Sequence, residues 1–306
     1  MKQKTFTKIL FLIIILICVI VYFVWFKYAN TKEGFLDTNY EKTVYLLWQN
    51  KKKKNQHGFG DKLRGAISTY QYCKEHKINL KIDATDDICS HFLKNVVIDN
   101  YDLIKDKEDI LTLINEDKLY DKLNTELSKS NSIYIYSNTT PRKELDDDDI
   151  EFAKYICEPS DLLKNEIQTK IKSLPLNYGI KHFRFHDDIF KKDFDESDPL
   201  FKKSFELLKS DYKENDVLIS NSINFIKYSK EKINIKTIIC DNNLCKVEHI
   251  GESTDTNSVK NSFVDFFITC NAKNIKSYTV YDWPSNFVSW SSKIYNIPFE
   301  NIQLKL

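Results

Sequence analysis

A histidine and an arginine stand two positions apart at the end of a segment that we predict to be a strand. His182 and Arg184 belong to residues 178–187, which read YGIKHFRFHD. Side chains two apart on a strand project from one face, and open α/β sheets bind ligands at the carboxyl ends of their strands. Arginine donates two parallel hydrogen bonds to a phosphate and stays charged at any working pH. The pair therefore predicts an anion site, with a structural salt bridge of Arg184 as the alternative.

Two segments nearer the C-terminus carry further polar groups with possible ligand roles. Asp265 stands among apolar residues of the predicted helix 258–271, so a carboxylate buried there needs a partner. Ser285 and Asn286 open another predicted helix, and the free N–H groups at a helix start attract phosphate. The alternatives are a surface acid for Asp265 and ordinary N-capping for Ser285 and Asn286.

A glycine-containing turn follows the first predicted strand. Gly58 and Gly60 let the backbone approach a ligand closely, and Asp61 and Arg64 come directly after them. Glycine turns after strands are common, so this motif alone is a weak indication of a binding site.

The elements that position these residues alternate between strands and helices. Residues 43–48 read as a strand, 62–75 as a helix and 78–82 as the next strand, which is a βαβ unit and demands a parallel sheet. Beyond a connector helix ending at 173 the alternation resumes. We predict strands at 133–136, 178–184, 216–220 and 235–239, and helices at 150–156, 160–173, 198–210, 222–230, 258–271 and 285–295. This pattern predicts an α/β fold with two Rossmann-like lobes, 43–173 and 174–306, facing each other across a cleft.

The four segments described above resemble, in order and spacing, the superfamily of α1,2-, α1,6- and protein-O-fucosyltransferases. They are GFGDKLRG at 58–65, YGIKHFRFHD at 178–187, DFFI at 265–268 and PSNF at 284–287, and the EPS segment at 158–160 is similar too. The resemblance implies a GT-B fold and inverting, metal-independent transfer of fucose from GDP-fucose to a glycan or glycoprotein hydroxyl. GDP-fucose is the implied donor substrate, and no cofactor is implied.

The resemblance also implies roles for individual residues. Arg184 would bind the diphosphate with His182 beside it, Asp265 would accept hydrogen bonds from guanine, and Asp61 and Arg64 would lie in the cleft near donor or acceptor. Ser285, Asn286, Gly58 and Gly60 would complete the donor site. The general base stays open among Asp187, Asp188, His186, Asp61, His249 and Glu252.

This sequence departs from the superfamily pattern at two places. Phe185 stands where a second arginine is common, and Ser220-Asn221 stands where relatives often carry Thr-Asp. These departures keep two alternatives open: a transferase of the same fold that uses another nucleotide sugar, and a catalytically silent, membrane-anchored glycan-binding protein.

Asp146–Asp149 is a run of carboxylates, for which a metal-binding Asp-x-Asp site is one interpretation. The better one is a helix start, where acids interact favourably with the helix dipole. No metal site is therefore expected.

The N-terminus predicts a membrane anchor. Residues 9–26 run without a charge for about the length of a bilayer-spanning helix, and lysines precede them without an acid, which predicts a cytosolic tail at 1–8. Residues 27–42 read as a stem. We expect a type II membrane protein with its catalytic region in the lumen of the Golgi or endoplasmic reticulum; a cleaved signal peptide is the alternative.

Charge and cysteine content bound the remaining possibilities. The chain has 306 residues and a formal net charge of +1, and without its lysine-rich N-terminus it is slightly acidic, so no nucleic-acid partner is expected. Cys240 and Cys245 are the candidate disulfide pair among an even number of cysteines outside the anchor, and free buried thiols are the alternative.

Overall fold

The computed structural model describes residues 19, 21, 40–49, 57–96, 110–114, 118–190, 192–238, 250, 253 and 255–305. The predicted anchor at 9–26 and stem at 27–42 lie almost wholly outside this set, as do Cys240, Cys245, His249 and Glu252. Among the residues that are described, no helix combines the length and the apolar character needed to cross a bilayer.

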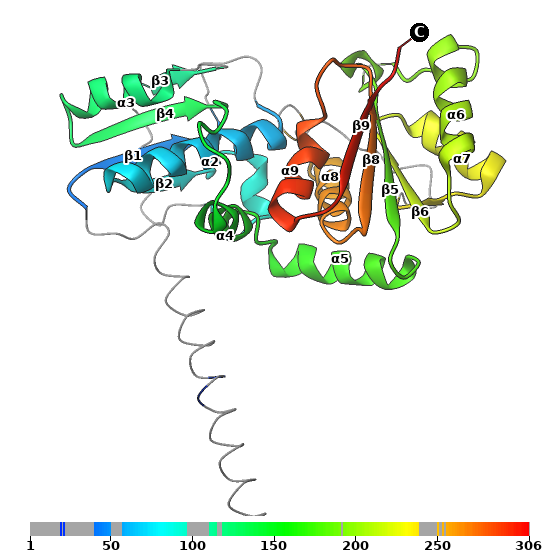
Figure 1. Ribbon diagram of the computed structural model, residues 1–306, viewed down its shortest axis with the longest axis horizontal. Helices are drawn as coiled ribbons and strands as arrows, with labels where there is room; N and C mark the ends of the chain where they lie inside the picture. The colour runs from blue at the N-terminus through cyan, green and yellow to red at the C-terminus, as the bar shows by residue number, and fades with distance from the viewer. Residues whose placement is uncertain are drawn as a thin grey trace, which may run out of the picture.

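Two parallel sheets, each with its own helices, form two lobes that lie side by side (Figure 1). The N-lobe sheet has the order β2-β1-β4-β3 and the C-lobe sheet the order β7-β6-β5-β8-β9. The strands are β1 (Thr43–Leu47), β2 (Asn79–Asp83), β3 (Ile110–Leu113), β4 (Ser132–Ser137), β5 (Gly179–Arg184), β6 (Asp216–Ser220), β7 (Lys236–Thr237), β8 (Asn274–Thr279) and β9 (Phe299–Gln303). The helices are α2 (Phe59–His76), α3 (Leu119–Leu127), α4 (Asp147–Ile156), α5 (Asp161–Ser173), α6 (Pro199–Asp211), α7 (Ile223–Ile233), α8 (Thr256–Thr269) and α9 (Asn286–Tyr295).

In the N-lobe, helix α2 crosses from β1 to β2 and presses on the end of β4. A Cβ atom at Gly65 would come within 2.0 Å of the Ser137 carbonyl oxygen, so only glycine allows this approach. Helix α4 starts with a capping box between Asp146 and Asp149, and Lys74 of α2 binds both carboxylates at 2.7 Å. The acidic run is therefore a helix start, as predicted. The carboxylates of Asp146 and Asp149 cap this helix and bind Lys74.

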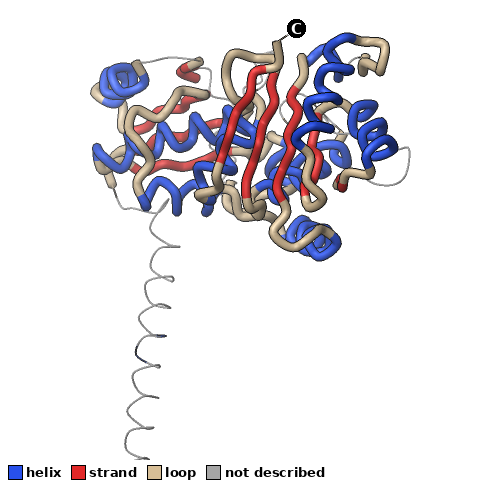
Figure 2. Tube along the Cα trace, turned by 45° about the vertical axis from the view of Figure 1, so that its right-hand side comes forward, coloured by secondary structure: helices blue, strands red, loops and turns tan. Residues whose placement is uncertain are grey.

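In the C-lobe, β5 is the central strand of the sheet, and helices cover both faces of the sheet (Figure 2). Phe183 points into an aromatic cluster that α6 and α7 complete, while Ile180 packs in the other core, to which α8 and α9 contribute. His182 and Arg184 lie on the same face of β5 as Ile180, and both line the cavity described below. The sheet thus places two polar side chains at the carboxyl end of its middle strand.

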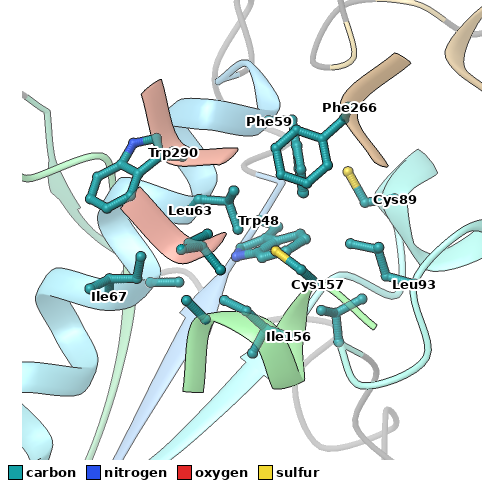
Figure 3. Packing of buried hydrophobic residues seen from close by; sticks show 14 of the residues in the cluster. Trp48, Phe59, Leu63, Ile67, Cys89, Leu93, Ile156, Cys157, Phe266 and Trp290 are labelled. Atoms are coloured by element: carbon teal, nitrogen blue, oxygen red, sulfur yellow. The ribbon is translucent and has the colours of Figure 1, made fainter. Parts of the chain in front are cut away.

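One apolar core runs from the N-lobe into the C-lobe. Phe59 of α2 lies edge-on to Phe263 and Phe266 of α8, with ring centroids 4.9 Å apart in both pairs. Figure 3 shows Phe59 against Phe266, with Trp48 beneath them and Trp290 of α9 beside α2. The two lobes are consequently joined by buried apolar surface as well as by the chain.

The α/β fold with two parallel sheets confirms the fold class, and the predicted elements are present with shifted ends. The prediction was incomplete, because β3, α3, β8 and β9 were not foreseen. Cys73, Cys89, Cys157 and Cys270 are buried free thiols, which was the alternative to disulfides for these four.

Candidate active site

A cavity of about 290 Å³ opens between the lobes, at the carboxyl ends of β5 and β6 and the starts of α2 and α9. This volume lies near the lower end of small-molecule pockets in proteins. The predicted site residues that line it are Gly58, Gly60, Asp61, His182, Arg184, Asp187, Asp265, Ser285 and Asn286. Arg64 is absent from the lining, and its guanidinium contacts the Asp61 carboxylate at 3.1 Å.

Arg184 is the last residue of β5, and its side chain is only 17 % exposed. Its guanidinium donates to the Phe185 carbonyl at 3.3 Å and pairs with Asp187. The rings of Phe190 and Tyr281 lie 5.5 and 5.9 Å from it. Asp187 is 63 % exposed, and ion pairs with an exposed partner are weak. A diphosphate carries more charge than one carboxylate, so it can displace Asp187 from the arginine.

His182 is buried beneath the arginine and is neutral. Its Nδ1 lies 3.1 Å from the Ser277 hydroxyl, and its ring stacks on Phe287 at 6.3 Å. Burial, with a smaller contribution from the positive charge of Arg184, lowers the pKa of His182 to about 3. A neutral imidazole at this place can make a hydrogen bond to a bound ligand through Nε2, but it is too weak a base to take a proton from a hydroxyl.

Asp265 faces the cavity from α8 and is the most strongly perturbed carboxyl group in the lining. Burial raises its pKa to about 7, and the charge of Lys170 opposes this rise. No described residue donates a hydrogen bond to its carboxylate. A buried carboxylate without donors is costly, so the site is suited to a ligand that brings N–H donors of its own.

Helices α2 and α9 point their N-termini into the cavity from opposite lobes. They approach so closely that a Cβ atom on Gly60 would lie 2.6 Å from the Cβ of Asn286. The Asn286 amide donates to the Asp61 carboxylate at 2.8 Å, so this side chain joins the lobes. Ser285 caps α9 without a side-chain hydrogen bond to the helix, which leaves its hydroxyl for a ligand. The paired helix starts place positive partial charge at the cavity, beside the carboxyl groups of Asp61, Asp187 and Asp265.

The structure adds cavity residues that sequence reasoning did not select. Asn221 accepts a hydrogen bond from the Phe185 N–H at 2.9 Å and donates to the Phe185 carbonyl at 3.1 Å, which holds the chain just after Arg184. Tyr281 and Trp283 line the cavity from the loop after β8. The available signal was position, because all three lie just beyond strand ends.

The departure at Phe185 also has a structural reason. Its ring is 1 % exposed and packs edge-on against Phe194 and Phe225, on the side of the sheet away from the cavity. A second arginine here would be buried among aromatic rings.

None of the described base candidates is marked out by its contacts. Asp61 is held by Arg64 and Asn286, Asp187 pairs with Arg184, and the exposed His186 lies edge-on to Tyr281 at 5.7 Å. Within the described part of the chain, no group of three or more His, Cys, Asp or Glu residues could hold a metal ion.

Comparison with solved structures shows which fold this is. The chain matches a mutant of Arabidopsis thaliana FUT1 in complex with GDP, with a TM-score of 0.50 and 12% sequence identity. The match covers 90% of this chain and 74% of that chain. It matches POFUT1 in complex with GDP-fucose with a TM-score of 0.50 and 8% identity, over 88% of this chain and 99% of that chain. It matches NodZ alpha-1,6-fucosyltransferase co-crystallized with GDP with a TM-score of 0.50 and 10% identity, over 83% and 92%.

The chain therefore has the GT-B fold of the fucosyltransferases. Neither a protein-family model nor a curated protein matches the sequence.

Proposed function

We propose that this protein transfers fucose from GDP-fucose to a hydroxyl group of a glycan or glycoprotein, with inversion at the anomeric carbon and without a metal. The observation that carries the proposal is the position of Arg184, whose half-buried guanidinium faces an inter-lobe cavity that two helix N-termini also enter. The solved structures of the same fold include complexes with GDP and GDP-fucose, which supports this choice of donor.

The proposed mechanism assigns each group a separate task. Departure of the diphosphate builds negative charge, which the Arg184 guanidinium and the N–H groups at the starts of α2 and α9 stabilise. Neutral His182 orients a phosphate or ribose oxygen by one hydrogen bond. The Asp265 carboxylate accepts hydrogen bonds from the N–H groups of guanine, which favours GDP over nucleotides whose bases lack that pair of donors.

Binding of GDP and transfer of fucose test this proposal together. Isothermal calorimetry should detect GDP binding to the full chain, and the Arg184→Ala and Arg184→Lys variants should lose about 100-fold or more in transfer, because neither can donate two parallel bonds to the leaving phosphate. Their thermal transitions should stay near that of the parent. Arg142→Lys is the matched control, since Arg142 lies over Tyr120 outside this cavity. Full activity of either Arg184 variant would refute the mechanism.

We also propose that residues 9–26 anchor the protein as a type II membrane protein, with its catalytic region in the lumen of the Golgi or endoplasmic reticulum. The charge-free run and the preceding lysines support this. Full-length protein should stay in the membrane pellet after alkaline carbonate extraction, and a chain starting at residue 28 should not. Release of the full-length chain would contradict the anchor.

A further inference from the structure

Two aromatic side chains at the mouth of the cavity have no part in the mechanism above. Trp283 is 60 % exposed, whereas Trp48 and Trp290 are 1 % and 3 % exposed. Tryptophan is largely buried in most proteins, and an exposed apolar surface beside a cavity is typical of a ligand-binding site. Trp283 stacks on Tyr281 with ring centroids 5.3 Å apart and 23° between the ring planes. We call Tyr281 and Trp283 the aromatic rim.

The aromatic rim is fixed to the same strand end as the arginine. The Val280 N–H donates to the Arg184 carbonyl at 3.1 Å, so the loop leaves β8 beside the end of β5. The centroid of the Tyr281 ring lies 5.9 Å from the Arg184 guanidinium. Trp283, which carries the exposed indole, follows two residues later. Asp282 accepts a hydrogen bond from Gln303 of β9, which holds the middle of the loop. The indole is thus presented on an anchored loop.

The position and chemistry of the aromatic rim favour a sugar ring as its ligand. Building on the proposed function, Arg184 marks the diphosphate and therefore the anomeric carbon next to it. An acceptor hydroxyl must reach that carbon through the mouth of the cavity, which the exposed Trp283 lines. A pyranose presents a flat face of C–H groups, and the electron-rich face of an indole attracts such positively polarised groups. In the proposed function guanine binds at Asp265, because the N–H donors of guanine match its carboxylate.

We infer that Tyr281 and Trp283 form the acceptor subsite and that the acceptor is a glycan whose pyranose ring stacks on Trp283. The protein hydroxyl of an unglycosylated acceptor would make no use of this surface. The inference rests on the proposed function and goes beyond it by naming the acceptor class and the residues that select it.

Titration of the GDP-saturated full chain with methyl β-D-galactopyranoside and methyl β-D-glucopyranoside tests the inference, with tryptophan fluorescence as the readout. At least one pyranoside should change the fluorescence saturably, and galactitol, which lacks a ring, should not. Trp283→Ala should weaken the pyranoside affinity about tenfold, as expected for loss of one stacking contact. Trp283→Phe should keep part of it. These two variants should be compared by ligand-detected NMR, because they lack the Trp283 indole whose fluorescence is expected to report binding.

Leu162→Ala is the control, because Leu162 is 75 % exposed on α5 and is not part of the cavity lining. It should bind the pyranosides as the parent does. Equal pyranoside affinity of Trp283→Ala and the parent, or no pyranoside binding to the parent–GDP complex, would overturn the inference. So would a loss of GDP affinity in Trp283→Ala, since the indole would then stack on the base. Failure of the parent to bind GDP at all would instead refute the proposed function.

Discussion

Asp265 and His182 illustrate how burial acts in opposite ways on an acid and a base. Burial favours the neutral form of each group, so the pKa of Asp265 rises to about 7 and that of His182 falls to about 3. Among the described residues, neither the Asp265 carboxyl group nor the His182 imidazole forms an ion pair with an oppositely charged side chain. Burial of Asp265 therefore lowers the stability of the empty protein as pH rises above about 3.8, and burial of His182 lowers it as pH falls below 6.5. Both residues gain when a ligand supplies hydrogen bonds.

The raised pKa of Asp265 predicts that donor binding depends on pH. Guanine N–H donors favour the ionised carboxylate, so affinity for GDP-fucose should fall about tenfold per pH unit below pH 7 and level off above it. GDP-fucose suits this measurement because its diphosphate does not titrate in that range. In Asp265→Asn the affinity should be about 100-fold lower, because two charge-assisted bonds are lost, and nearly independent of pH. A flat pH profile in the parent would contradict the guanine assignment.

The same substitution should stabilise the empty protein. The folded carboxyl group holds its proton up to about pH 7, whereas the unfolded one releases it near the ordinary aspartate pKa of 3.8. Folding therefore takes up a proton between these values, and this group's contribution to the free energy of unfolding falls as pH rises through that window. Asp265→Asn should raise the melting temperature at pH 7.5 by a few degrees and leave it nearly unchanged at pH 4. A lower melting temperature at pH 7.5 would contradict the assignment of a costly buried charge.

Residue type and position were enough to predict part of the site. Arg184, His182 and Ser285 could be selected because phosphate chemistry requires such groups at strand ends and helix starts, and the structure brings them to one cavity. Asn221 and Trp283 also lie just beyond strand ends, but their contacts depend on which strands are neighbours and on the path of a loop. Neither follows from residue type.

At the scale of elements, polar residues concealed several strands. Strand β8 contains Lys276 and Ser277, which weakened its apolar signal, yet Lys276 pairs with Asp211 at 3.0 Å and Ser277 contacts His182. Helix α3 did carry helical spacing in Leu119, Leu123 and Leu127, all buried, but the surrounding acid-rich segment hid it. Partners on neighbouring strands and helices, which a single segment does not contain, make these sequences compatible with burial.

The loop after β6 supplies a prediction about how Arg184 is held in place. The two hydrogen bonds between Asn221 and the Phe185 backbone hold this residue, and the Phe185 carbonyl also accepts a hydrogen bond from Arg184. Asn221→Asp keeps the acceptor but sets an oxygen against that carbonyl, and Asn221→Leu removes both bonds. Each should lower kcat about 10- to 100-fold with a smaller change in KM, because a displaced arginine stabilises the leaving diphosphate less well.

Asn224→Ala provides the comparison for the Asn221 variants. Asn224 lies on the first turn of α7, donates to the Phe194 carbonyl at 3.0 Å and does not line the cavity. It should leave kcat within about twofold of the parent, as expected for an exposed polar contact. If Asn221→Leu also kept its kcat, or lost only thermal stability, Asn221 would be structural and would not position the arginine.

For the whole molecule, the continuous core predicts that two sheets unfold as one unit. Phe263 of α8 is fully buried and contacts Phe59 and Phe92 of the N-lobe, whereas Phe205 of α6 packs within the C-lobe against Tyr228. The lobes are also joined where Asn286 donates to Asp61. A calorimetric scan should therefore show a single transition, because unfolding of either lobe would expose the core that both lobes share.

Two cavity-creating substitutions test this coupling. Phe263→Ala and Phe205→Ala should each cost about 3–5 kcal/mol and move the single transition down by roughly 10 °C, although only the first lies between the lobes. If the lobes were independent, the scan would show two transitions. Phe205→Ala would then shift only the C-lobe transition, and Phe263→Ala would separate the two further. GDP binds in a cavity lined by both lobes in our proposal, so saturating GDP should raise the whole transition in both variants. A GDP-dependent shift confined to part of the transition would show that the lobes are coupled more weakly than their shared core implies.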